Sequence, residues 1–252
     1  MTTEEPSIRQ LERDDGATLA YRATPGHSPT MVFFGGFRSD MTGSKASALE
    51  DQSRRQGTAF VRFDYFGHGV SSGRFEQGTI GRWRDDGLAV VDELTEGPLL
   101  LVGSSMGAWI ALLVALARPA RVGALVGIAS APDFTEELIW QRCTPEERST
   151  LEREGLLWRH SPGEEQPWAL THRLIEEARL HCVLAGPVPL RCPVRLVHGL
   201  SDAEVPWDLS RRLVENLESD DVELILVKRG DHRLSSTPDL KRLEALVTPL
   251  LR

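Results

Sequence analysis

The chain has 252 residues, enough for one large α/β domain with its own hydrophobic core, and it shows no low-complexity tract or internal repeat. A net charge of −8 argues against nucleic acid as a partner, and the longest apolar stretches are too short for stable insertion into a membrane. Cys143, Cys182 and Cys192 are odd in number and lack metal-ligand spacing, so we expect free thiols, a reducing compartment and no metal.

The first segment of the chain, "MTTEEPSIRQLERDDG", is acidic and has no apolar run. It resembles neither a secretory signal nor a transit peptide, so the cytoplasm is the expected location. Within and after it, "SIRQLER" and "TLAYRAT" are joined through Asp15-Gly16. Two such runs around an Asp-Gly turn predict an antiparallel hairpin.

Beyond the hairpin, short apolar runs alternate with amphipathic stretches. The predicted strands are Thr30–Phe34, Thr58–Asp64, Pro98–Gly103, Val122–Ser130, Cys192–Gly199 and Val222–Gly230. The predicted helices are Gly43–Gln56, Ile80–Leu94, Ser105–Ala117, Trp207–Glu218 and Asp239–Leu250. Strands without strict alternation, separated by helices, are typical of a parallel sheet covered on both faces, so the predicted fold class is α/β.

One segment breaks this rhythm, from about Pro132 to about Pro189. No strand pattern is visible in it. Its predicted helices are Thr135–Arg142, Pro145–Glu154 and Trp168–Cys182. It also contains three of the chain's tryptophans, Trp140, Trp158 and Trp168. Because it lies between two predicted strands, we interpret it as a helical lid inserted into a single domain of residues 1–252. A set of extra surface helices is the alternative. The segment is too long and too patterned for a linker.

The stretch Gly103-Ser104-Ser105-Met106-Gly107 lies between a predicted buried strand and a predicted buried helix. This context turns the weak pattern G-x-S-x-G into a strong one, because small neighbours allow the strained turn that exposes a nucleophilic serine at a helix N-terminus. Ser105 is the predicted nucleophile. Ser104 lies one position off the pattern.

A serine nucleophile needs a base, and the order expected for this architecture is serine, acid, histidine. Among the seven histidines, His232 follows the last predicted strand and is the predicted base. Asp202, in the loop after the preceding strand, is the predicted acid that orients it, and Glu204 is the rival. His68 and His198 are expected to be structural, since each follows or ends a strand beside a glycine.

The developing oxyanion requires backbone donors. We expect the N–H of Met106, just after the nucleophile, and the N–H of Phe37, in the Gly35-Gly36-Phe37 loop after a predicted strand. The same loop read alone is a tight turn, and both interpretations hold together. The chain has no P-loop, no HExxH motif and no Cys/His cluster, so no cofactor is expected. "FGHGVSSG" lacks dinucleotide-binding spacing and is interpreted as a loop that supports the edge of the site.

These features resemble the α/β-hydrolase family over nearly the whole chain. Within it, "SDMTGSKA", "GSSMGAW", "HGLSDAEVPW" and "DHRLS" are most similar to the mitochondrial palmitoyl-protein thioesterases, which are also described as acyl-glucuronide esterases. The resemblance implies the triad Ser105, Asp202 and His232. Ala108 stands where those relatives have a second glycine. With no transit peptide, the chain looks like a bacterial cytoplasmic relative.

The combined interpretation is a serine hydrolase that cleaves acyl thioesters or carboxylic esters through an acyl-enzyme. Its expected partner is a small-molecule or acylated-protein substrate, with the acyl chain bound by Trp140, Trp158 and Trp168 of the lid. The alternative for the tryptophans is that they attach the lid to the core. The alternatives for function are a general carboxylesterase and a binding module that has lost turnover. Acyl-chain length and oligomeric state stay open.

Overall fold

The computed structural model describes residues 6–160 and 166–251. Its centre is an eight-stranded sheet in the order β1-β2-β4-β3-β5-β6-β9-β10. The strands are β1 (Arg9–Glu12), β2 (Thr18–Thr24), β3 (His27–Phe34), β4 (Thr58–Phe63), β5 (Leu99–Ser104), β6 (Val122–Ile128), β9 (Val194–Gly199) and β10 (Val222–Val227). The strands from β4 to β10 run parallel, and β2 joins β4 antiparallel. All the predicted strands are present, with ends shifted by a few residues.

The predicted N-terminal hairpin is confirmed, because β1 pairs antiparallel with β2. Its turn contains Gly16 with φ 81°, a left-handed conformation that glycine adopts without a Cβ clash. The Asp15 carboxylate accepts a hydrogen bond from the Ala17 N–H at 3.0 Å. The turn chemistry read from the sequence thus places the two antiparallel strands at the edge of the sheet.

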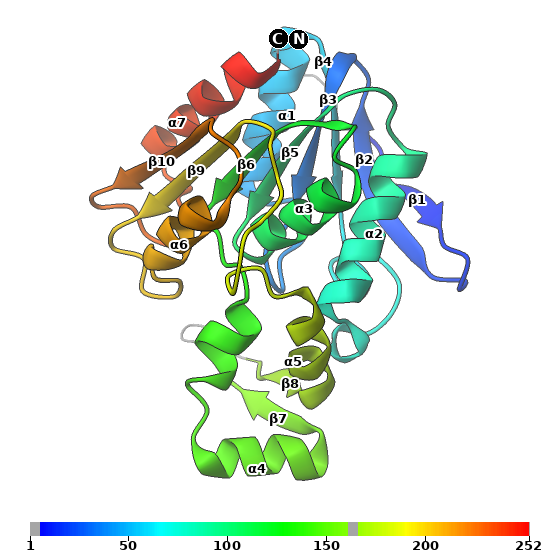
Figure 1. Cartoon of the computed structure of the whole chain (residues 1–252). Coiled ribbons are helices and arrows are strands. Elements are labelled where there is room, and N and C mark those ends of the chain that lie inside the picture. The colour runs from blue at the N-terminus through cyan, green and yellow to red at the C-terminus, as the bar shows by residue number, and fades with distance from the viewer. Residues whose placement is uncertain (1–5, 161–165, 252) are drawn as a thin grey trace.

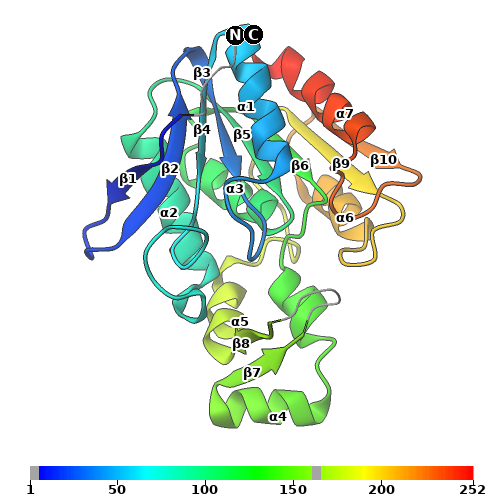
Figure 2. The ribbon, with the colours of Figure 1, turned by 180° about the vertical axis from the view of Figure 1, so that it is seen from behind.

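Helices cover both faces of the sheet (Figures 1 and 2). α2 (Ile80–Glu93), α3 (Met106–Ala117) and α6 (Asp208–Asn216) lie on one face, and α1 (Ser44–Gln56) and α7 (Thr237–Val247) lie on the other. Short 3₁₀ turns are η1 (Phe75–Gln77) and η4 (Thr248–Leu251). Two hydrophobic clusters follow from this arrangement, one under α2 and α3 and one under α1 and α7. Because helices cover the sheet on both sides, the central strands β5 and β6 consist almost entirely of apolar residues and glycine.

The segment between β6 and β9 protrudes from the carboxyl ends of the strands (Figure 1). We call residues 132–189 the insertion; within it, residues 161–165 lie outside the described residues. Its elements are the π-helical turn η2 (Thr135–Trp140), α4 (Pro145–Glu154), β7 (Leu156–Arg159), β8 (Trp168–Thr171), α5 (His172–Ala178) and the 3₁₀ turn η3 (Arg179–His181).

The expectation of a purely helical insertion is wrong, because β7 and β8 form an antiparallel pair. The predicted helix Trp168–Cys182 begins only at His172, since its first turn belongs to β8. Each strand has four residues, too few to show a period. By contrast, α4 has its predicted ends, because Thr144 and Glu147 form a capping box before it and Gly155 ends it with φ 74°.

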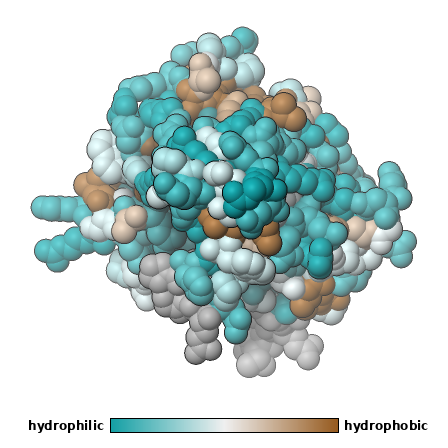
Figure 3. Space-filling model, turned by 90° about the horizontal axis from the view of Figure 1, so that it is seen from below, coloured by the Kyte–Doolittle hydropathy of each residue, from teal (hydrophilic) through white to brown (hydrophobic). Residues whose placement is uncertain are grey.

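Within residues 6–160 and 166–251, no helix combines the length and the apolar character needed to span a membrane. The same residues contain no group of three or more His, Cys, Asp or Glu side chains placed to hold a metal ion. Seen from the insertion end, the surface carries small hydrophobic patches separated by hydrophilic residues (Figure 3). Trp158 and Leu180 of the insertion are 58% and 80% exposed.

Candidate active site

Ser105 lies on a sharp turn between β5 and α3, with φ 56° and ψ −121°. A non-glycine residue at positive φ is strained, so neighbouring elements must hold it there. The flanking glycines permit this, because a Cβ on Gly103 would lie 2.3 Å from the Gly107 carbonyl oxygen, and one on Gly107 would lie 2.1 Å from that of Phe34. The predicted strained turn is therefore present, and it leaves the Ser105 side chain partly exposed.

Three side chains distant in sequence meet at this turn. The Ser105 Oγ lies 3.1 Å from His232 Nε2, and His232 Nδ1 lies 2.8 Å from Asp202 Oδ2. Each comes from the carboxyl end of a strand: Ser105 follows β5, Asp202 follows β9 and His232 follows β10. The geometry places the imidazole where it can accept the serine proton while the carboxylate holds its other nitrogen.

The Asp202 carboxylate is completely buried and accepts hydrogen bonds on both oxygens. Its Oδ1 accepts from the N–H groups of Glu204 and Val205 at 2.9 and 2.8 Å. Its Oδ2 lies 3.1 Å from His198 Nε2 in addition to its contact with His232. Burial alone would raise the pKa of Asp202, but the hydrogen bonds from the two imidazoles and the Val205 N–H outweigh it and hold that pKa well below its ordinary value.

Two other carboxylates close to His232, those of the rival Glu204 and of the adjoining Asp231, are placed differently. The Glu204 carboxylate is 69% exposed and lies 3.9 Å from His232 Nε2, on the side of the ring that faces the serine. The Asp231 Oδ1 accepts a hydrogen bond from the Leu234 N–H at 2.9 Å and so stabilises its own loop. Neither carboxylate reaches Nδ1 of the imidazole in the way that Asp202 does.

The loop after β3 approaches the serine closely. A Cβ on Gly36 would lie 3.6 Å from the Ser105 Cβ, so the backbone next to Phe37 is beside the nucleophile. Met106 is the first residue of α3, and its N–H has no acceptor four residues earlier within that helix. The two expected oxyanion donors therefore lie on the two backbone segments that flank Ser105.

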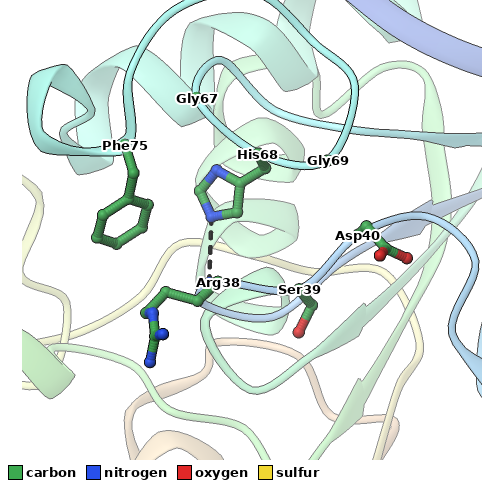
Figure 4. Close-up of a pocket in the computed structure, with 7 residues that line it drawn as sticks. All are labelled: Arg38, Ser39, Asp40, Gly67, His68, Gly69 and Phe75. Carbon is green, nitrogen blue, oxygen red and sulfur yellow. Dashed lines mark hydrogen bonds between the residues drawn. The ribbon is translucent and has the colours of Figure 1, made fainter. Parts of the chain in front are cut away.

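His68 supports this loop from the "FGHGVSSG" segment, as the sequence predicts. Burial lowers the pKa of His68 from 6.5 to about 4, so its ring is neutral near pH 7. The Arg38 N–H donates to its Nε2 at 3.2 Å, and Figure 4 shows the ring directed at the Arg38 backbone. Arg38 has φ 60°, so the contact holds a strained residue directly after Phe37.

A hollow of about 220 Å³ opens beside the same loop (Figure 4). It is lined by Arg38, Ser39, Asp40, Gly67, His68, Gly69 and Phe75. Ser39 and Ser105 both lie close to Gly36, since a Cβ on that glycine would lie 3.3 Å from Ser39 Oγ and 3.6 Å from Ser105 Cβ. Ser105 is not among the lining residues, and the volume of the hollow is below that of a typical ligand pocket.

The structure separates the three tryptophans of the insertion. The Trp168 ring lies 5.3 Å from the Phe37 ring and 5.4 Å from the Arg38 guanidinium. The Trp140 ring lies 5.1 Å from the guanidinium groups of both Arg148 and Arg179, so it joins parts of the insertion to one another. The Trp158 side chain is largely exposed on β7. Only Trp168 contacts the loop that carries the expected oxyanion donor.

An aromatic cluster around Phe37 is a feature that the sequence did not indicate. The Phe37 ring contacts four other rings at centroid distances of 5.0 to 6.0 Å; they belong to Phe75, Trp83, Phe134 and Trp168. These rings come from four separate segments of the chain, so no local pattern relates them. The cluster places apolar surface directly beside the backbone that approaches Ser105.

The close approach at Gly107 predicts a stability effect. Gly107→Ala is expected to lower the free energy of unfolding by about 1–3 kcal/mol or more, because its Cβ must displace the β3 backbone. Thermal denaturation should show a lower Tm than that of the wild-type protein, by about 2–4 °C for each kcal/mol of stability lost. Gly123→Ala is the control, since its Cβ meets nothing closer than 3.6 Å. Equal Tm values for the two variants would contradict the predicted clash.

A mostly parallel sheet with helices on both faces and a serine on a strained strand-to-helix turn defines an α/β hydrolase. The comparisons with known proteins agree. The family model described as "Serine aminopeptidase, S33" matches residues 28–163. The chain belongs to this α/β-hydrolase family.

Relatives match nearly the whole chain. It is 41% identical over 248 residues to "Palmitoyl-protein thioesterase ABHD10, mitochondrial" of Bos taurus, an alignment that covers 97% of this chain and 80% of that protein. The structure of "Alpha/beta hydrolase domain-containing protein 10 from mouse" superposes with a TM-score of 0.90 at 39% identity, covering 97% of this chain and 98% of that one. The structure described as "Putative hydrolase from Agrobacterium vitis S4" superposes with a TM-score of 0.93 at 37% identity, covering 99% of this chain and 100% of that one.

Proposed function

We propose that this hydrolase cleaves acyl thioesters or carboxylic esters through a covalent acyl-enzyme on Ser105. The observation that carries the proposal is the chain of contacts from Ser105 Oγ to His232 Nε2 at 3.1 Å and from His232 Nδ1 to Asp202 Oδ2 at 2.8 Å. The names of the curated relatives add the thioester substrate class, since they are called palmitoyl-protein thioesterases.

The proposed reaction uses each group once in each half. Ser105 Oγ attacks the acyl carbonyl carbon while His232 Nε2 takes the hydroxyl proton, and Asp202 stabilises the imidazolium. The N–H groups of Phe37 and Met106 stabilise the tetrahedral oxyanion. The intermediate collapses, expels a thiolate or alkoxide that takes the proton from His232, and leaves an acyl-Ser105. Water then attacks this ester by the same route and releases the carboxylic acid.

The aromatic cluster around Phe37 supports an acyl chain as the bound group. Apolar surface beside the reacting carbonyl stabilises each buried methylene by about 0.8 kcal/mol. That binding energy can position the carbonyl at Ser105. A thiolate leaves more readily than an alkoxide, so thioesters depend less on His232 as an acid. We therefore infer turnover of medium or long acyl thioesters, from small molecules or acylated proteins, together with activated esters.

Trp168 is expected to determine chain-length preference. Trp168→Ala should raise KM for long acyl substrates more than for acetyl substrates, because its ring lies 5.3 Å from Phe37 in the aromatic cluster. Trp158→Ala is the matched control, since that side chain is 58% exposed. The measurement is kcat/KM over p-nitrophenyl esters and acyl-CoA thioesters of graded length. An equal loss on all lengths would make Trp168 a structural support of the insertion only.

The test of the function itself is reaction with a fluorophosphonate probe followed by the same substrate panel. Labelling of Ser105 and turnover of thioesters support the proposal. Labelling with turnover of esters alone would support the general carboxylesterase. Absence of both labelling and turnover would support a binding module.

We also propose the cytoplasm as the location of this protein. The curated relatives are named mitochondrial, and cell fractionation distinguishes the two compartments.

A further inference from the structure

His198, at the end of β9, contacts the candidate catalytic acid. Its side chain is completely buried, and its Nε2 lies 3.1 Å from Asp202 Oδ2 and 3.0 Å from the Val205 carbonyl oxygen. On the other side of the ring, Nδ1 lies 2.7 Å from the Ser210 Oγ of α6, which is also buried. The imidazole therefore joins helix α6 to the acid loop.

These contacts determine the direction of the hydrogen bond to the acid. The two oxygens beside Nε2, a carboxylate oxygen and a carbonyl oxygen, can only accept. Nε2 must therefore carry a proton and donate it, and no other arrangement satisfies a buried group of this kind. The Ser210 hydroxyl, which can donate or accept, completes the ring's hydrogen bonding at Nδ1.

The hydrogen bond from His198 matters because the Asp202 Oδ2 must stay within reach of His232. Oδ1 of Asp202 accepts two backbone N–H groups of its own loop. Oδ2 is the atom that holds His232, at 2.8 Å from Nδ1. Among the described residues, the contacts of Oδ2 are with His198 and with His232 itself. Without His198, only His232 would hold this oxygen, and the carboxylate could turn about its Cβ–Cγ bond away from the imidazole.

We propose that His198 is a positioning residue of this hydrolase, which fixes the Asp202 carboxylate and through it the orientation of His232. Hydrogen bonds then run without a break from Ser210 of α6 through His198, Asp202 and His232 to Ser105. The backbone joins the same two loops, since the Ser201 N–H donates to the Gly230 carbonyl oxygen at 2.9 Å. The inference rests on the proposed function, because it assigns His198 a part in that reaction.

A purely structural role for His198 would give a different result, and paired variants distinguish the two. His198→Leu keeps the approximate volume and removes the donor. His198→Gln keeps an N–H near the position of Nε2. We expect the leucine variant to lose about 10- to 100-fold in kcat with little change in KM, by analogy with the groups that orient metal-binding histidines and carboxylates in other proteins. The glutamine variant should recover much of that loss.

Ser210→Ala tests the outer end of the chain where the leucine variant fails to fold. We expect it to lower kcat by about two- to tenfold, the rate equivalent of one hydrogen bond. Ser53→Ala, in an equally buried serine of α1, is the control and should leave kcat unchanged. Tm is measured for every variant, so that loss of folding is recognised separately from loss of rate.

A spectroscopic measurement reads the position of the acid without turnover. The downfield proton resonance of His232 Nδ1–H should shift and exchange faster with solvent in His198→Leu than in wild type, and return toward the wild-type position in His198→Gln. Folded His198→Leu protein with wild-type kcat and an unshifted resonance would overturn the inference. Wild-type protein that neither reacts with fluorophosphonate nor turns over esters would instead overturn the proposed function.

Discussion

Replacement of Ser105 by alanine is expected to abolish formation of the acyl-enzyme and to reduce turnover to background. Among residues 6–160 and 166–251, the Ser105 hydroxyl is the one in hydrogen-bond contact with His232, whose Nε2 lies 3.1 Å from Ser105 Oγ. In serine hydrolases, loss of the nucleophile removes about 10⁶-fold in kcat. The measurement is mass spectrometry of the fluorophosphonate adduct, together with hydrolysis of a p-nitrophenyl ester.

Ser104→Ala is the matched control. Ser104 is the last residue of β5, and its side chain is buried rather than directed at the histidine. Its loss should leave the adduct on Ser105 and most of the turnover. An adduct on Ser104, or on no serine, would contradict the assignment of the nucleophile.

Asp202→Asn is expected to lower kcat by about 10⁴-fold, by analogy with the serine-protease variant of the same kind. Two backbone N–H groups require an acceptor at one end of the side chain, so the asparagine oxygen must stay there. Its NH₂ group then faces His232 Nδ1, which has to accept rather than donate. The proton moves to Nε2, and the imidazole can no longer take the proton of Ser105.

Glu204→Gln is the control for this prediction. Its carboxylate is largely exposed and lies on the Nε2 side of His232, so the substitution should change kcat by less than about tenfold. Kinetics of both variants on one ester substrate distinguish the two acids. A large loss in Glu204→Gln with a small one in Asp202→Asn would make Glu204 the acid.

The main elements of the fold could be predicted because their signals are local. Apolar runs marked the parallel strands, and the insertion was recognised from the absence of that rhythm between β6 and β9. Its pair of strands, β7 and β8, was missed. Each has four residues and is stabilised by the other, so neither shows the periodicity that a longer strand displays.

The candidate triad could also be predicted, because chain order and the ends of strands indicate which loops converge. Which tryptophan of the insertion contacts the site could not be predicted. Trp140, Trp158 and Trp168 share the same local signal, and only packing shows that Trp168 meets Phe37 while Trp158 is exposed. The sequence predicts a structural role for His198, but its contact with Asp202 depends on how the loop after β9 turns back.

The sequence by itself determined the strained turn at Ser105, since its glycines are required by close backbone approach at that position. It also determined the strands of the sheet, because short apolar runs without alternation are stable only where both of their faces are buried. Only the tertiary structure decided which oxygen of Asp202 holds His232, which rings surround Phe37, and how His198 links α6 to the acid. These depend on distances between side chains from separate segments, and such distances exist only once the whole chain is packed.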